Sequence, residues 1–89
     1  MSKRVFTILL THRNSFGDVT SPDMMDIIKT YRAAYIKSGY DPVRFMACFA
    51  FKDKKQRDQA AKEMRAHKWD IICRDNGIID DEYYNKEWY

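Results

Sequence analysis

The chain has 89 residues, of which 45% are hydrophobic and 33% are charged. This length favours a single domain, and this composition is typical of a folded globular protein, which argues against a disordered chain and a collagen-like repeat. No uncharged run approaches the roughly 20 apolar residues that a membrane helix needs, so we expect no membrane partner.

The formal net charge is +3, but it is unevenly distributed along the chain. Residues 80–89 have a net charge of −3, which leaves +6 on residues 1–79. We therefore predict a single α+β domain over 1–79 and an acidic, aromatic C-terminal tail over 80–89. A basic domain is compatible with contact to nucleic acid or to an acidic partner.

The two cysteines indicate the compartment. Cys48 and Cys73 each lie in an apolar run, and they do not form a C-x-x-C pair. They are predicted to be reduced, buried thiols, which is typical of a cytosolic protein. The apolar stretch from Val5 to Leu10 is about half the length of a signal-peptide core, so we expect a cytoplasmic location.

The first half of the chain is predicted to contain a strand, a loop and a helix. Residues 4–11 combine β-branched and aromatic residues over one strand length. Residues 12–21 are rich in Asn, Ser, Gly, Asp and Thr, which predicts a loop. Ser21 is a good N-cap and Pro22 a good first helical residue, and apolar residues follow at spacings of three and four, so we predict a helix that ends at a C-cap on Gly39.

The second half is predicted to contain a strand, a helix and a further strand. Residues 43–51 alternate in a way that is typical of a strand, and Asp53 can cap a helix that ends near Lys68. Residues 69–74 are predicted to form the next strand. Residues 75–77, Asp-Asn-Gly, predict a turn, and Ile78 with Ile79 is an optional short fourth strand.

This β-α-β-α-β order predicts an α+β fold, a ferredoxin-like plait with both helices on one face of a small sheet. The bulkier side chains of each strand are expected to face the helices: Phe6, Ile8, Leu10, Phe45, Phe49, Phe51 and Ile71. The opposite sheet face is then expected to show Lys3, Val5, Thr7, Leu9, Thr11, Arg44, Met46, Cys48, Ala50, Ile72 and Arg74. Because its centre is apolar, we expect this face to be covered by the C-terminal segment, by a second copy of the chain or by a partner.

Catalysis has little support in the sequence. His12 and His67 are the only histidines, and they are separated from each other and from the cysteines by more than zinc-ligand spacing allows. The chain contains no P-loop, Rossmann glycine pattern, nucleophile elbow or H-E-x-x-H motif. We therefore expect no enzyme, no cofactor and no metal, and we keep a dimeric α/β-barrel enzyme as a third hypothesis.

Nucleic-acid binding is the alternative hypothesis. Residues 44–51 can be laid over the RNP1 pattern of RRM domains, but Met46 and Cys48 stand where that pattern needs rings for base stacking. Binding to RNA is therefore expected to be weak and without sequence preference. The residues available for phosphates are the cations of the second helix: Lys54, Lys55, Arg57, Lys62 and Arg65.

The leading hypothesis is a small, non-enzymatic protein that docks on a larger protein partner, as phage-type inhibitors and regulators do. Aromatic rings are enriched in the tail, and loops held by a rigid scaffold often carry binding residues. A homodimer is a further alternative. The candidate partner-binding residues are Arg13 and Phe16 in the first loop, Arg44 and Arg74 on the open sheet face, and Tyr83, Tyr84 and Trp88 in the tail.

Overall fold

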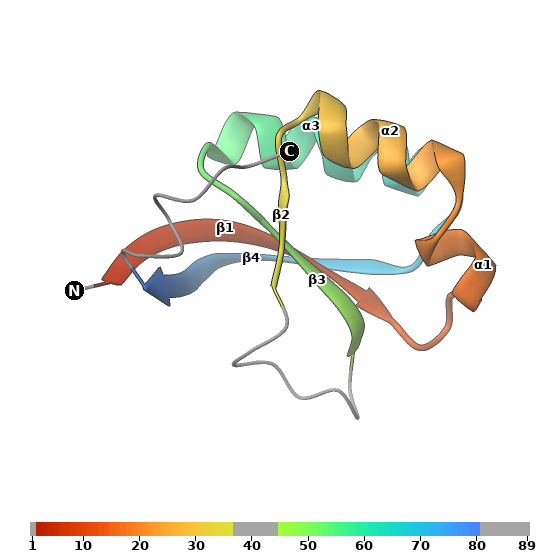
Figure 1. Ribbon diagram of the computed structural model, residues 1–89, viewed down its shortest axis with the longest axis horizontal. Helices are drawn as coiled ribbons and strands as arrows, with labels where there is room; N and C mark the ends of the chain where they lie inside the picture. Colours follow the sequence, from red (N-terminus) through yellow and green to blue (C-terminus); the bar gives the residue numbers. More distant parts are fainter. Residues whose placement is uncertain (1, 37–44, 81–89) are drawn as a thin grey trace.

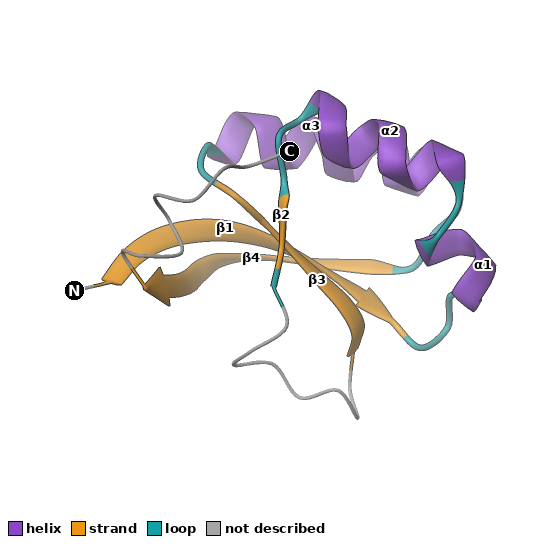
Figure 2. Ribbon diagram, in the orientation of Figure 1, coloured by secondary structure: helices purple, strands orange, loops and turns teal. Residues whose placement is uncertain are grey.

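The computed structural model describes residues 2–36 and 45–80, and it shows a four-stranded sheet with helices over one face (Figure 1). The strand order is β2-β3-β1-β4, and all neighbouring strands are antiparallel. Figure 2 shows α2 and α3 together over the sheet, with α1 at its end. The elements are β1 (Ser2–Thr11), α1 (Phe16–Val19), α2 (Pro22–Thr30), β2 (Ala34–Tyr35), β3 (Phe45–Phe51), α3 (Lys54–Ala66) and β4 (Ile71–Asp80).

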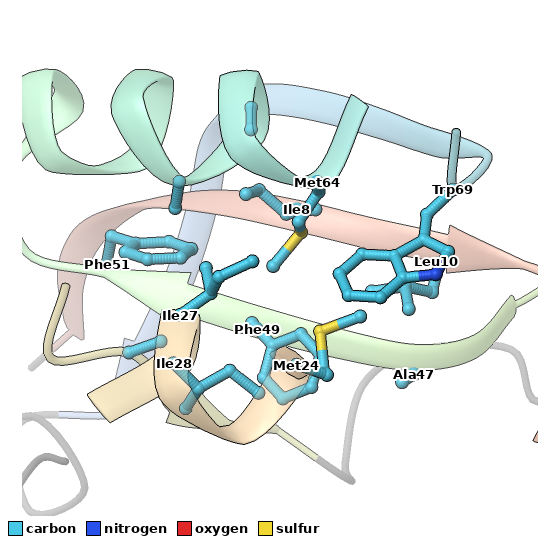
Figure 3. Packing of buried hydrophobic residues seen from close by; sticks show 13 residues of the cluster. Ile8, Leu10, Met24, Ile27, Ile28, Ala47, Phe49, Phe51, Met64 and Trp69 are labelled. Atoms are coloured by element: carbon cyan, nitrogen blue, oxygen red, sulfur yellow. The ribbon is translucent and has the colours of Figure 1, made fainter. Parts of the chain in front are cut away.

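The main core lies between the helices and the sheet. The stripe of α3 that packs on the sheet consists of Ala60, Ala61 and Met64, and its two small alanines allow the helix to approach closely. Figure 3 shows Leu10 of β1 beside the Trp69 ring, and Phe49 of β3 close to Met24 and Ile28. The predicted inward positions of Ile8, Leu10, Phe49, Phe51 and Ile71 are confirmed.

The predicted α+β class is confirmed. The order of the elements along the chain resembles that of a ferredoxin-like plait, but the topology differs from the predicted one. The predicted helix starts correctly, with Ser21 accepting a hydrogen bond from the Met24 N–H. It ends at Thr30 and not near Gly39, which lies outside the described residues. The following residues form β2, an edge strand that was not predicted.

The early end of α2 is a Schellman motif without a glycine. Arg32 adopts a left-handed conformation with φ of 55°, and the Ala33 N–H donates to the Ile28 carbonyl at 2.9 Å. Ala34 then pairs with Ala50 of β3, and its side chain is buried on the opposite face of the sheet. The sequence pattern missed this end because Arg32 is not one of the residues that normally mark it.

A β-bulge in β3 corrects the predicted face of two residues. Leu10 pairs with Ala47 but Thr11 pairs with Phe45, so Met46 is the extra residue on β3. Met46 therefore packs against the helix-side core, while Phe45 packs on the opposite face. The predictions that Phe45 faces the helices and that Met46 faces away were wrong, because alternation is broken at a bulge.

A second bulge lies in β4, where a turn was predicted. Val5 pairs with Gly77 and Thr7 pairs with Arg74, so Asp75 and Asn76 together lie opposite one residue of β1. Residues 71–80 are thus one continuous strand, and the predicted turn with a separate fourth strand is wrong. A Cβ atom on Gly77 would lie 2.8 Å from the Thr7 methyl group, so glycine is required here for close packing.

The face opposite the helices is buried within the single chain. Val5, Leu9, Cys48 and Ala50 are fully or almost fully buried, and they form a second apolar cluster. Residues 81–89 of the tail, which were expected to cover this face, lie outside the described residues, and a second copy or a partner over it stays a prediction. No helix in the described part of the chain is long and apolar enough to cross a membrane.

Candidate functional site

The segment predicted as a loop contains a short helix, α1. Ser15 and Asp18 form a capping box, in which the Ser15 Oγ accepts from the Asp18 N–H at 3.2 Å and the Asp18 carboxylate accepts from the Ser15 N–H at 3.0 Å. The hydrogen bond from the Ser15 backbone, and after it that from the Ser15 side chain, lower the pKa of the Asp18 carboxyl group. The S-x-x-D spacing of Ser15 and Asp18 is the sequence signal for this helix.

Asn14 ties this segment to the start of β4. Its side chain is 8% exposed, and its amide donates to the carbonyl oxygens of Thr11 at 2.9 Å and Asp70 at 2.8 Å. Its carbonyl oxygen accepts from the Asp70 N–H at 2.8 Å. The Thr11 hydroxyl also donates to the Asp70 carboxylate. Because these contacts join segments 56 residues apart, α1 is held in a defined position beside the sheet.

Phe16 begins α1 and points outwards. Its side chain is 78% exposed, which makes it the most exposed of the large hydrophobic residues in the described ranges. The Phe16 ring therefore does not fold back over the core, and Gly17 lies within the helix.

An apolar groove of about 340 Å³ opens beside this ring. We call it the α1–β3 groove, because α1 forms one wall and β3 the opposite part of its lining. Met25 and Ile28 of α2 and Tyr35 of β2 complete it. The lining residues are Phe16, Val19, Thr20, Met25, Ile28, Tyr35, Met46 and Phe49.

The groove follows directly from the irregular features of the fold. The bulge in β3 turns Met46 into the groove. The early end of α2 places Tyr35 on an edge strand, where the centre of its ring lies 5.7 Å from the centre of the Phe49 ring. Its floor, Ile28 and Phe49, belongs to the main core and is buried. Methionine side chains adapt to differently shaped ligands, so Met25 and Met46 suit a surface that accommodates a partner.

Replacing Phe16 by alanine should leave stability nearly unchanged. Because its ring is mostly exposed, the loss of buried area is small, and we expect a change of at most about 0.5 kcal/mol in the free energy of unfolding. Phe49→Ala is the matched control, since the same truncation at a buried position should cost about 3 to 5 kcal/mol. Urea unfolding of both variants measures this, and similar losses in the two would contradict an outward Phe16.

Arg57 does not belong to the surface on which it was predicted. Its side chain is 3% exposed, and its guanidinium donates to the carbonyl oxygens of Arg74 at 2.7 Å and Thr7 at 3.2 Å. It also donates to the carboxylates of Asp58 at 2.8 Å and Asp75. The prediction that Arg57 is available to phosphates was wrong, because this arginine satisfies backbone groups next to the β4 bulge.

The Asp75 carboxylate is the counter-ion of this arrangement. The hydrogen bond from Arg57, and after it that from Lys54 at 3.1 Å, lower the pKa of Asp75 below its usual value. The ionised form is thus favoured in the folded protein, and its contribution to stability is complete above the unfolded-state pKa of about 4 and is lost as the pH falls through the lowered value.

Acid should therefore destabilise the protein partly through Asp75. We expect the free energy of unfolding to fall below about pH 4, and to fall less steeply in Asp75→Asn, which cannot titrate at this position. Urea unfolding of both proteins between pH 7 and pH 2 measures the two slopes. Parallel curves over the whole range would show that the Arg57–Asp75 contact does not contribute.

The other cations predicted for nucleic-acid binding are exposed on α3, but acids are interspersed among them. Lys54, Lys55 and Lys62 surround a shallow depression that Asp53 and Asp58 also line. Arg65 contacts the Cys73 sulfur at 3.7 Å. This surface therefore lacks the uninterrupted positive charge that backbone binding of nucleic acid uses.

The remaining predicted residues are not gathered at the groove. Arg13 is exposed in the loop before α1, whereas Arg74 lies on the opposite sheet face with its guanidinium 5.6 Å from the centre of the Phe45 ring. Arg44, Tyr83, Tyr84 and Trp88 lie outside the described residues. Of the three predicted partner-binding residues that the structure describes, Arg13, Phe16 and Arg74, only Phe16 lines the groove.

Neither histidine belongs to a metal-binding group in the described ranges. His67 stacks on the Trp69 ring with centroids 4.5 Å apart. Within residues 2–36 and 45–80, no group of three or more His, Cys, Asp or Glu side chains could hold a metal ion. The candidate site in the described ranges is therefore the apolar α1–β3 groove.

Comparison with known proteins adds no assignment. No protein-family model matches the chain, and neither a curated protein nor a solved structure matches it.

Proposed function

We propose that the chain is a small, non-enzymatic binding protein that docks on a larger protein through the α1–β3 groove. The observation that carries this proposal is the exposed Phe16 ring at the wall of an apolar groove. A large ring that contributes little to folding is costly to leave in water, and aromatic side chains beside apolar pockets often dominate binding energy at protein interfaces. An inhibitor or regulator of phage type would use such a surface.

The alternatives find less support in the geometry. The opposite sheet face, on which an RRM stacks bases, has a buried centre, and Arg74 lies over its Phe45 ring. A dimeric α/β-barrel enzyme would pair this same face between two copies. The groove instead lies on the other side of the sheet, between the helices and the short edge strand β2.

The proposal is tested by photo-crosslinking in the cells that produce the protein. The photoreactive p-benzoyl-phenylalanine replaces Phe16 in one variant and Gln59, an exposed residue of α3, in the control variant. We expect one discrete crosslinked protein from position 16 and not from position 59. Identical patterns from the two positions, or no crosslinked protein at position 16, would contradict docking through the groove.

A further inference from the structure

The sheet ends on one side at a long edge strand, β4. Within residues 2–36 and 45–80, β4 is the last strand in the order, and no described strand pairs with its outer edge. It is ten residues long, whereas β2 at the other edge has two residues. Ile72 is 41% exposed and Ile78 66% exposed. Folded proteins commonly shorten, charge or cover an edge strand, so a long one with exposed isoleucines is suited to pairing.

The pairing with β1 shows which backbone groups of β4 point outwards. The Thr11 N–H donates to the Asp70 carbonyl oxygen at 3.3 Å. Because backbone direction alternates along a strand, the odd-numbered residues of β1 direct their N–H and C=O groups to β4. Their partners on β4 are Ile72, Arg74, Gly77 and Ile79. The backbone groups of Ile71, Cys73 and Ile78 therefore point to the outer edge.

The bulge in β4 places Ile71 and Ile78 on the same face of the sheet. Ile71 packs against the helix-side core. Ile78 precedes Ile79, which belongs to the cluster on the opposite face, so the Ile78 side chain is directed to the helix side as well. In a regular strand, two residues seven positions apart lie on opposite faces. The extra residue of the bulge removes this difference.

This irregularity selects the strand that can pair with the edge. A regular strand cannot match the faces of both Ile71 and Ile78, because its own residues seven positions apart lie on opposite faces. A second β4 carries the same bulge and can match both. When two copies pair antiparallel with Ile71 of each opposite Ile78 of the other, a two-fold axis relates them, and Cys73 of each lies opposite Asn76 of the other.

Neither charge nor α3 obstructs this pairing. The Asp75 carboxylate, which lies close to the axis, is bound by Arg57 and by Lys54 of its own chain. The Arg74 guanidinium is turned to the Phe45 ring on the other face. Helix α3 contacts β1, β3 and β4, so it is centred over β1, the middle strand of the three, and not over the outer edge of β4.

We propose that the outer edge of β4 pairs antiparallel with β4 of a second copy of the chain, which joins the two sheets into one continuous sheet. The α1–β3 groove lies at the opposite edge, beside β2, so the dimer presents one groove at each end. This inference goes beyond the proposed function and does not depend on it. Because the paired segment is short, the dimer dissociates on dilution.

Analytical ultracentrifugation of the full chain tests the association. We expect the equilibrium to shift from monomer to dimer between about 1 µM and 1 mM. Ile78→Lys should raise the dimer dissociation constant about tenfold or more, because it places a charge at the paired edge. Its side chain is exposed, so the variant should fold. Phe16→Lys, the same kind of change at an exposed residue of α1, is the matched control and should leave the constant unchanged.

A disulfide tests the register. Asn76→Cys places a thiol opposite Cys73 of the second copy, where the Cα atoms of a hydrogen-bonded pair are about 5.5 Å apart and within disulfide range. Within one chain the two positions are about 10 Å apart along the strand, which is too far. We expect Asn76→Cys to form a covalent dimer on mild oxidation with diamide. Adding Cys73→Ser should abolish this dimer, and Gln59→Cys on α3 should form none.

Three results would overturn the inference. The first is a chain that stays monomeric up to about 1 mM, as pairing of β4 with this chain's own residues 81–89 would produce. The second is a dimer weakened by Phe16→Lys and not by Ile78→Lys, since the copies would then meet at the groove. The third is a covalent dimer that persists with Cys73→Ser, which would show another register. A monomeric chain would leave docking through the groove in place, because crosslinking at position 16 tests it separately.

Discussion

Arg57→Met is expected to destabilise the protein by about 3 kcal/mol, because it leaves the carbonyl oxygens of Thr7 and Arg74 without their charged donor. Methionine retains much of the packing volume, so the loss reports the hydrogen bonds and not a large cavity. The Phe6 ring, which lies 5.9 Å from the guanidinium carbon of Arg57 and 5.4 Å from that of Arg4, would lose one of two cationic neighbours.

The measurement is urea unfolding of the full chain, with Lys55→Met as the control. Lys55 is the second residue of the same helix but is exposed, so this change should stay within about 0.5 kcal/mol in the free energy of unfolding. Equal stability of Arg57→Met and the unmodified protein would mean that the bulge in β4 does not need this arginine.

Gly77→Val is expected to lower the free energy of unfolding by about 3 kcal/mol. A Cβ atom at this position would lie 2.8 Å from the Thr7 methyl group and 3.2 Å from both a Val5 methyl group and the Val5 carbonyl oxygen. The neighbours belong to buried residues of β1, so relief requires a shift of the strand and not of a flexible side chain.

Gly17→Ala provides the contrasting case in the same protein. Its added Cβ would meet only the Ser15 Oγ, at an ordinary 3.8 Å, within α1. Because alanine is the better helix former, this variant should be unchanged or more stable by up to about 1 kcal/mol. A Gly77→Val variant that melts at the same temperature as Gly17→Ala would refute the close packing of β4 on β1.

The elements that follow local rules were predictable from the sequence. Ser21 with Pro22 marks the start of α2, and Asp53 marks the start of α3, where its side chain accepts from the Lys55 N–H at 3.0 Å. Strands β1 and β3 were recognised from their alternating apolar residues. In each case the signal lies within a few residues of the feature that it predicts.

The features that make the candidate site depend on contacts distant in sequence. The bulge at Met46 is defined only by pairing with β1, and the residues that follow the end of α2 at Thr30 become a strand only by pairing with β3. Arg57 resembles its exposed neighbours on a helix of mixed charge until β1 and β4 each place a carbonyl group beside its guanidinium. Phe16 was identified, but the groove beside it was not.

The central claim is that a partner enters the α1–β3 groove, and the methionine methyl groups can report this directly. Met25 and Met46 line the groove, whereas Met24 and Met64 are fully buried in the core outside its lining. The protein labelled with ¹³C at its methionine methyl groups is titrated, in an NMR experiment, with the protein captured at position 16. We predict that the Met25 and Met46 resonances shift with the binding isotherm, while those of Met24 and Met64 move little. Saturated binding without a shift at Met25 and Met46 would contradict the account.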